Sequence, residues 1–475
     1  MAASIRSLAF AALALVVIAG RADAQTASMP IPAMPASLEP YLHGVPSGAP
    51  TATPLPLSLA DAVTRGLAHN LGALLQADRV QSAAGERWKA LSEALPRVSA
   101  KVSDTREEVD LAAFGFTGIP GLVLPTVVGP FNVFDARVAA SAPLLDLEAL
   151  GDVRRERANE RAETHSYRNA RELVILAVAN LYEQALADQS RVEAVHAEAE
   201  MAGTLVTLAQ DQRSAGVVAG IDVVRQQVEL ERARQRVIAA ENEFEKQKLR
   251  LARAIGVPLG QVIDLTDHMA FTPAAPLTAE AAMAAAYAQR EDLKTAEERV
   301  NAALADHQAA HGALLPTLRF DVDYGMIGPS PSTARSTYTA AAILRVPIFE
   351  GGAAHGKLLQ VDADVRERQA ERDDLKAGIA FDVQSALLDL HASEAAVAVA
   401  KSASALAGQQ LTQARDRFAA GVTSSIELAQ AQDAVATASD NYITTLYMHL
   451  MARAELAHAL GMSEEQFAGY LGGRQ

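Results

Sequence analysis

Apolar residues recur every seven positions over two long stretches of the chain. Between Val174 and Ala209 one row of mostly apolar or small residues repeats seven apart, and a second row lies three or four positions from it. The same double row returns between Ile379 and Ala414. Two rows at this spacing form the seam of a coiled coil. A helix over residues 148–214 would be roughly 100 Å long at 1.5 Å per residue, so the pattern predicts paired rods rather than an ordinary globular core.

The segments between these rods change to a different period. Residues 97–145 and 316–350 alternate apolar and polar positions, which is typical of β-strands with one apolar face. Each predicted strand is about as long as the 9–11 residues that a transmembrane β-strand needs. We expect the apolar positions to face lipid, and they include Phe134, Val138, Phe320, Val322, Tyr324, Tyr338 and Leu344.

Four such strands raise a question of pairing. In lipid, the open edges of a sheet leave N–H and C=O groups unsatisfied. Either the strands therefore pair on a soluble scaffold, or several copies of the chain close a barrel. Three copies of four strands each would give about 12 strands, which lies within the sizes known for membrane barrels.

The chain also duplicates itself. The segment from Pro56 aligns without a gap with the segment from Pro276, and the aligned helices end in Leu95-Pro96 and Leu315-Pro316. A period of this length indicates a duplicated domain rather than a short solenoid repeat. We expect two repeats of the same order, followed by a C-terminal tail over 466–475: the first over 57–275, with a β-hairpin over 97–145 and a helical hairpin over 148–254, and the second over 276–465, with a β-hairpin over 316–350 and a helical hairpin over 352–460.

The N-terminus predicts export from the cytoplasm. Arg6 precedes an apolar run from Leu8 to Ala19, and Ala22-Asp23-Ala24 ends it, as in a secretory signal peptide over 1–24. An uncleaved anchor helix is the alternative, but the run is shorter than the ~20 apolar residues that a membrane span needs. Residues 25–56 are rich in proline and predict an extended tail rather than packed structure.

Composition excludes several classes of function. The chain has 475 residues and a net charge of −15 without a basic run, which argues against nucleic acid as a partner. It has no cysteine, so we expect no disulfide, no thiolate metal site and no lipid anchor on an N-terminal cysteine. Residues 351–357 match the start of a phosphate-binding loop but lack the Ser or Thr that follows it, and His307 and His311 lack a third ligand. We therefore expect no catalytic residue, no cofactor and no metal site.

Several motifs together resemble one known family. They are the LPR and LPT helix ends, PFNVFDARVAASAPLLD over 130–146, RVPIFEGGAAHGK over 345–357, and the paired turns AGVVAGID and AGVTSSIE over 215–222 and 420–427. As a set they make the chain similar to the TolC-like outer membrane efflux proteins over nearly all of residues 57–465.

The resemblance implies a fold and a set of partners. The fold would be mainly α with a membrane β-barrel portion, in which duplicated long coiled-coil helical hairpins form a periplasmic α-barrel and four β-strands per protomer complete a trimeric 12-stranded barrel. The protein would be a homotrimer in the lipid of the cell outer membrane. It would conduct substrate passively from an inner-membrane pump, through a periplasmic adaptor (membrane fusion) protein, in a tripartite efflux or type I secretion system.

The resemblance also assigns candidate site residues. The two turns resemble the tips at which adaptor hairpins dock, which singles out Gly216, Val217, Gly421, Val422 and Thr423. Any helical hairpin needs such turns, with glycine ending one helix and Asp222 or the Thr423–Ser425 hydroxyls capping the next. The resemblance places a periplasmic aperture at Glu427 and Gln430, where Gln430 stands in the place of a second acidic residue. A solvated first-turn glutamate is the alternative for Glu427.

Two further readings of the whole chain remain open at this point. A periplasmic coiled-coil scaffold without a channel would explain the long helices, although the alternating segments count against it. A periplasmic adaptor would need a single hairpin between split lipoyl-like halves, which the two hairpins and four strands do not match.

Overall fold

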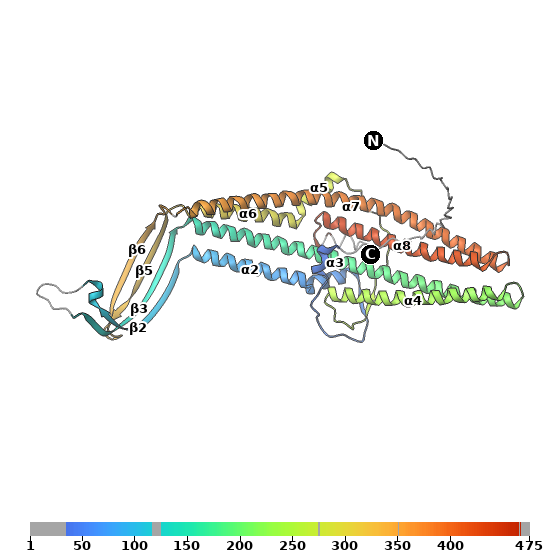
Figure 1. Ribbon diagram of the computed structural model, residues 1–475, viewed down its shortest axis with the longest axis horizontal. Helices are drawn as coiled ribbons and strands as arrows, with labels where there is room; N and C mark the ends of the chain where they lie inside the picture. The colour runs from blue at the N-terminus through green and yellow to red at the C-terminus, as the bar shows by residue number, and fades with distance from the viewer. Residues whose placement is uncertain (1–34, 116–124, 274–275, 350, 465, 467–475) are drawn as a thin grey trace, which may run out of the picture.

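The protein is a long bundle of helices that carries a β-sheet at one end (Figure 1). The computed structural model describes residues 35–115, 125–273, 276–349, 351–464 and 466. The predicted signal peptide over 1–24 lies outside the described residues, as does the predicted C-terminal tail apart from Gln466.

Two very long helices organise the bundle. Helix α3 (Leu147–Ser214) has 68 residues and α7 (Ala353–Ala419) has 67. Each turns back through a tight loop into a helix of 35 residues, α4 (Gly220–Ala254) after α3 and α8 (Ser425–Ala459) after α7. The predicted pair of long helical hairpins is therefore confirmed.

Shorter helices extend the bundle toward the sheet. Helices α1 (Leu59–His69) and α2 (Leu71–Glu93) belong to the first repeat, and α5 (Ala279–Gln289) and α6 (Glu291–Gly312) to the second. Helix α3 packs between α2 and α6 at the sheet end and between α4 and α8 at the other end, while α7 packs on the far side of α6 and α8 (Figure 1). The helices thus form one layer, in which α2 and α4 lie along one edge and α7 along the other.

Four strands form an antiparallel sheet in the order β2-β3-β5-β6. They are β2 (Arg97–Asp110), β3 (Val127–Leu145), β5 (Thr317–Gly328) and β6 (Arg335–Arg345), and the 3₁₀ helix η2 (Leu111–Phe114) follows β2. The register aligns the predicted apolar positions across the sheet, because Val138 lies opposite Tyr324 and Tyr324 lies opposite Tyr338. Arg137, on the other face, donates hydrogen bonds to Asp135 and Asp323. The predicted four-stranded sheet with one apolar and one charged face is confirmed.

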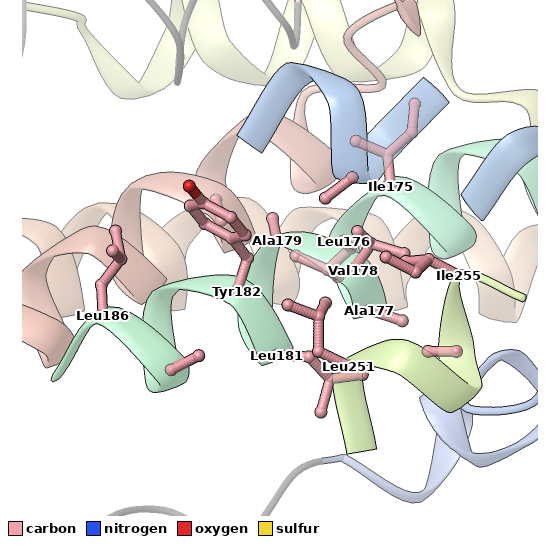
Figure 2. Close-up of a cluster of buried hydrophobic side chains, with 14 of the residues drawn as sticks. Ile175, Leu176, Ala177, Val178, Ala179, Leu181, Tyr182, Leu186, Leu251 and Ile255 are labelled. Atoms are coloured by element: carbon pink, nitrogen blue, oxygen red, sulfur yellow. The ribbon is translucent and has the colours of Figure 1, made fainter. Parts of the chain in front are cut away.

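The main core lies at the middle of the molecule, where α3 crosses the other elements. Every residue from Val174 to Ala179 is buried, and Figure 2 shows Tyr182, Leu186, Leu251 and Ile255 gathered beside them. The Tyr182 hydroxyl donates a hydrogen bond at 2.9 Å to the carbonyl of Leu57, which ties the N-terminal segment to this core.

The expectation of an unpacked tail over 25–56 is wrong from Pro35 onward. A 3₁₀ helix, η1 (Ala36–Tyr41), buries Leu38, and the strand β1 (Leu55–Leu57) pairs in parallel with β4 (Ile263–Leu265). Leucines between the prolines bury enough apolar surface to order the segment, which is what proline-rich disordered tails lack. Residues 25–34 of the predicted tail lie outside the described residues.

Among the described helices, none has a stretch both long enough and apolar enough to pass through a membrane.

Candidate functional site

The two hairpin tips lie together at the end of the bundle far from the sheet (Figure 1). In both turns a glycine takes the left-handed conformation that ends a helix, with φ of 74° at Gly216 and 71° at Gly421. The next residue closes the turn in the same way in each, because Val217 donates its backbone N–H to Gln212 at 2.9 Å and Val422 donates to Arg417 at 3.0 Å. The duplicated sequences therefore build duplicated turns.

The tips touch each other and expose apolar side chains. A Cβ added to Gly421 would lie 3.1 Å from a methyl carbon of Val217, so the first tip rests against the second. Val217 is 57% exposed and Val422 is 69% exposed. The structure therefore brings the predicted tip residues of both repeats into one small apolar surface.

Polar bonds join the two hairpins just behind this surface. The buried Ser425 hydroxyl of α8 donates to the Asp222 carboxylate of α4 at 2.5 Å, and Arg225 donates to both residues at 3.3 Å. Below them, the Gln212 amide donates to the carbonyls of Phe418 and Ala419 at 2.8 and 3.1 Å. We call Asp222, Arg225 and Ser425 the inter-hairpin lock.

The lock corrects the expected role of these side chains. The N-cap residues of α4 and α8 are Ala219 and Ser424, and neither helix has a side-chain capping bond. The expectation that Asp222 and the Thr423–Ser425 hydroxyls cap these helices is therefore wrong. Sequence analysis missed Arg225 and Gln212 altogether. A cation three residues after the first-turn aspartate was the available signal, since that spacing places both on one helix face.

Apolar side chains from all four helices pack behind the lock. Leu205, Val223, Leu411, Phe418 and Leu428 belong to this cluster, which we call the tip core. Gln226 of α4 is fully buried, and within the described part of the chain neither of its amide atoms has a hydrogen-bond partner. A buried polar group left unpaired costs about 1–3 kcal/mol. The packed tip therefore contains an unfavourable contribution beside its favourable contacts.

The predicted aperture residues lie on the same helix as the lock. Glu427 accepts a hydrogen bond at 2.8 Å from Arg417 and a second from the Thr423 hydroxyl, so its carboxylate is held within its own hairpin. Gln430 is exposed one turn further along α8. The geometry brings Thr423 and Glu427 together and leaves Gln430 apart from them.

At the other end of the molecule, the apolar face of the sheet is uncovered. Val138, Tyr324, Tyr338 and Leu344 are exposed, as is Phe320, while Phe134 and Val322 are half-buried on the same face. The cross-strand register places all seven of these predicted residues on this face. Such a face needs a covering in the assembled protein.

The residues that could suggest chemistry have ordinary structural partners. The rings of His307 and His311 lie 4.6 Å apart, and His307 bonds to Asp362 at 3.0 Å. Lys357, the last residue of the segment that partly matches a phosphate-binding loop, pairs with Asp306 at 3.3 Å. No group of three or more potential metal ligands occurs among the described residues.

Comparison with known proteins agrees with this geometry. A family model described as outer membrane efflux protein matches residues 70–257 and 282–462. The alkaline protease secretion protein AprF of Pseudomonas aeruginosa is 24% identical over 346 residues, covering 70% of this chain and 71% of that protein. The pyoverdine export outer membrane protein OpmQ of Pseudomonas putida is 26% identical over 267 residues, 54% of each.

Solved structures share the fold. The outer-membrane channel OprN aligns with a TM-score of 0.74 at 19% identity, covering 85% of this chain and 89% of that one. The outer membrane channel CmeC of Campylobacter jejuni also gives 0.74, at 16% identity and 85% coverage of each chain.

Proposed function

The chain belongs to the outer membrane efflux protein family, and we propose that three copies of it form the exit duct through which an inner-membrane pump discharges its substrate. The protein is an outer membrane channel whose helical part lies in the periplasm. The family is one of channels, so we propose that the chain carries out no chemistry on its cargo.

The open edges of the protomer support the trimer most directly. In the described residues, β2 and β6 each have a strand partner on one side only. Unpaired backbone groups in lipid cost several kcal/mol each, so the sheet needs neighbours at both edges. Three copies of this four-stranded sheet close a ring of 12 strands, with the apolar face toward lipid and the charged face toward the channel.

The helical layer is open at the same two edges. Helix α4 exposes apolar residues along one side and α7 exposes another such row, at spacings that fit a helix face. The rows are Val224, Val228, Ile238 and Leu249 on α4, and Phe381, Leu388, Val399 and Leu406 on α7. Pairing α7 of one copy with α4 of the next buries both rows and completes an α-barrel below the β-barrel.

Conduction in this arrangement is passive, and the tips control it. We propose that the hairpins of a periplasmic adaptor dock on Gly216, Val217, Gly421, Val422 and Thr423, because small exposed apolar residues let another helical hairpin approach closely. Glu427 and Gln430 would line the aperture behind this contact. Opening requires the two hairpins of each copy to separate, which breaks the inter-hairpin lock.

Selection of cargo belongs, in this proposal, to the pump and the adaptor. One relative is named for secretion of a protease and another for export of pyoverdine. Ducts of this kind therefore serve both polypeptides and small molecules, and the tips determine which pump complex engages the channel.

The tip assignment has a direct test. Replacing Gly421 by Asp and Val422 by Arg should abolish export of the native cargo while leaving an outer membrane trimer with heat-modifiable migration. The same pair of substitutions at Gly203 and Thr204 is the control, since a Cβ at Gly203 meets nothing within 4 Å. Normal export by the tip variant would contradict adaptor docking at this site, and fractionation of the unaltered protein away from the outer membrane would contradict the duct itself.

A further inference from the structure

We propose that Trp88 is an intersubunit anchor, whose indole packs on Leu358 and Leu359 of the next copy of the chain. The proposal rests on the trimer proposed above and adds a residue that holds neighbouring copies together where the helices meet the sheet. We infer this contact between copies from an equivalent contact inside the protomer, where α3 of the first repeat meets α6 of the second.

That contact joins the two repeats where α3 begins and α6 ends. A Cβ on Gly312 would lie 2.7 Å from the backbone of Leu147 and Glu148, so the two helices cross in close contact. Arg155 pairs with Asp306 at 2.8 Å, and Arg154 donates to Gln308 at 3.2 Å. We call this contact of α3 with α6 the inter-repeat junction.

The short helix of each repeat also packs on the long helix of its own repeat. Arg87 of α2 pairs with Glu160 of α3, and His307 of α6 pairs with Asp362 of α7. Arg87 and His307 occupy equivalent positions in the aligned repeats. This second kind of contact occurs twice in the protomer, whereas the inter-repeat junction occurs once. The inter-repeat junction joins α3 of the first repeat to α6 of the second. The equivalent contact, absent from a single protomer, would join α7 of one copy to α2 of the next.

The sheet places the same two elements side by side. Strand β6 leads directly into α7, and α2 leads directly into β2. When β6 of one copy pairs with β2 of the next, the start of α7 must lie beside the end of the neighbouring α2. The helical and the strand arguments therefore lead independently to one contact.

Alignment of the repeats identifies the residues in that contact. Gln308 corresponds to Trp88 in the gapless alignment of the short helices. Pro143 corresponds to Pro347, and counting from these prolines without a gap into the start of α3 and α7 aligns Arg154 and Arg155 with Leu358 and Leu359. The paired turns further along the chain require one extra residue in α7, which this alignment places after Leu359. Inside the protomer, Gln308 and Arg154 form a polar contact. At the equivalent contact between copies, Trp88 would pack against Leu358 and Leu359.

The exposed side chains of the single protomer fit such an apolar contact between copies. Trp88 is 59% exposed, and in the described residues its ring is covered on one side by the Arg87 guanidinium at 5.4 Å. Leu359 is 56% exposed, and Ile348 and Phe349 just before α7 are 94% and 87% exposed. Large apolar side chains therefore stand uncovered at both edges and at the same level of the molecule. Aromatic residues at the centre of such contacts carry much of the binding energy.

The chain is well suited to a test, because Trp88 is its only tryptophan and it has no cysteine. Trp88→Cys combined with Leu358→Cys should give covalent dimers and trimers under mild oxidation. Gln308→Cys combined with Arg154→Cys is the matched control, which should crosslink only within one chain because those residues meet inside the protomer.

Intrinsic fluorescence of the unaltered protein gives the second measurement. In the trimer, Trp88 emission should be shifted to shorter wavelength and resist both aqueous acrylamide and a brominated lipid. Trp88→Ala should lower the temperature at which the trimer dissociates, and Trp88→Phe should restore most of the loss.

Two outcomes would overturn the proposal in different ways. An intact trimer that forms no crosslink, and whose emission is quenched by brominated lipid, would place Trp88 in the lipid headgroup layer, where tryptophan is enriched. Quenching by acrylamide in an intact trimer would place it in water. A chain that stays monomeric in the outer membrane would instead refute the trimer itself.

Discussion

At the scale of single residues, the inter-hairpin lock opposes opening with few bonds. Hydrogen bonds to charged groups contribute about 1.5–3 kcal/mol each, and the unpaired amide of the buried Gln226 offsets part of that. The packed tip is therefore stabilised by a small difference, as the opening proposed above requires.

Removing the serine hydroxyl should shift this balance. Ser425→Ala deletes the donor to Asp222 and leaves the carboxylate with Arg225. We expect the contact between the two hairpin tips to lose about 1–3 kcal/mol of stability. The variant should then show a higher single-channel conductance in planar bilayers. Ser214→Ala is the control, because among the described residues that hydroxyl bonds within its own helix, to the carbonyl of Gln210. Equal conductance of the two variants would show that the lock does not restrain the aperture.

A half-buried carboxyl on α3, that of Glu172, should make the stability of the protein depend on pH. Burial, together with Glu291 and Asp292 nearby, raises the pKa of Glu172 from 4.5 to about 8. The folded protein therefore holds a proton that the unfolded chain releases above about 4.5, and this stability is lost as pH rises through 8. The free energy of unfolding should fall by up to about 1.4 kcal/mol per pH unit in that window for this group. Thermal unfolding at pH 6 and pH 8.5 should differ less in Glu172→Gln, and an unchanged difference would exclude this carboxyl.

At the scale of elements, the two periods in the sequence predict most of what is observed. A seven-residue row in α3 and α7 and a two-residue alternation in β3 and β5 each report directly on burial of one face, so both element types follow from sequence alone. Strands β1 and β4 have three residues each and show no such period. Their pairing depends on residues some 200 positions apart, which no local pattern contains.

The duplication predicts the register of the strands that meet between copies. Within the protomer Ala140 of β3 lies opposite Val322 of β5. The equivalent pair is Leu344 of β6 and Val102 of the next β2, since Pro143 aligns with Pro347 and Leu95 with Leu315. Leu344→Cys with Val102→Cys should therefore form covalent trimers. Leu344→Cys with Val98→Cys, on the same face but four residues away, should not. The reverse result would mean that the two junctions differ in register.

At the scale of the whole molecule, the sequence predicted where the two turns lie but not how they are held together. The turns at Gly216 and Gly421 are local features with a glycine signal, and both were found from sequence. The bonds from Ser425 to Asp222 and from Gln212 to Phe418 cross between hairpins about 200 residues apart. These bonds depend on how the two helical hairpins pack side by side. The periodicity of apolar residues shows which face of a helix is buried, but it does not show which atoms meet there.

The apolar face of the sheet allows a test of the proposed β-barrel in the membrane. Tyr324 and Tyr338 lie opposite each other near the middle of that face. A lysine at the bilayer midplane costs about 2–4 kcal/mol, and three copies of the chain multiply this cost, so Tyr324→Lys should deplete the trimer from the outer membrane. Thr339→Lys, on the charged face beside Asp323, should leave the trimer in place. Fractionation and heat-modifiable migration measure both variants. If Tyr324→Lys, alone or with charges at Phe134 and Val322, leaves localisation unchanged, the sheet does not contact lipid and the proposed trimeric β-barrel is wrong.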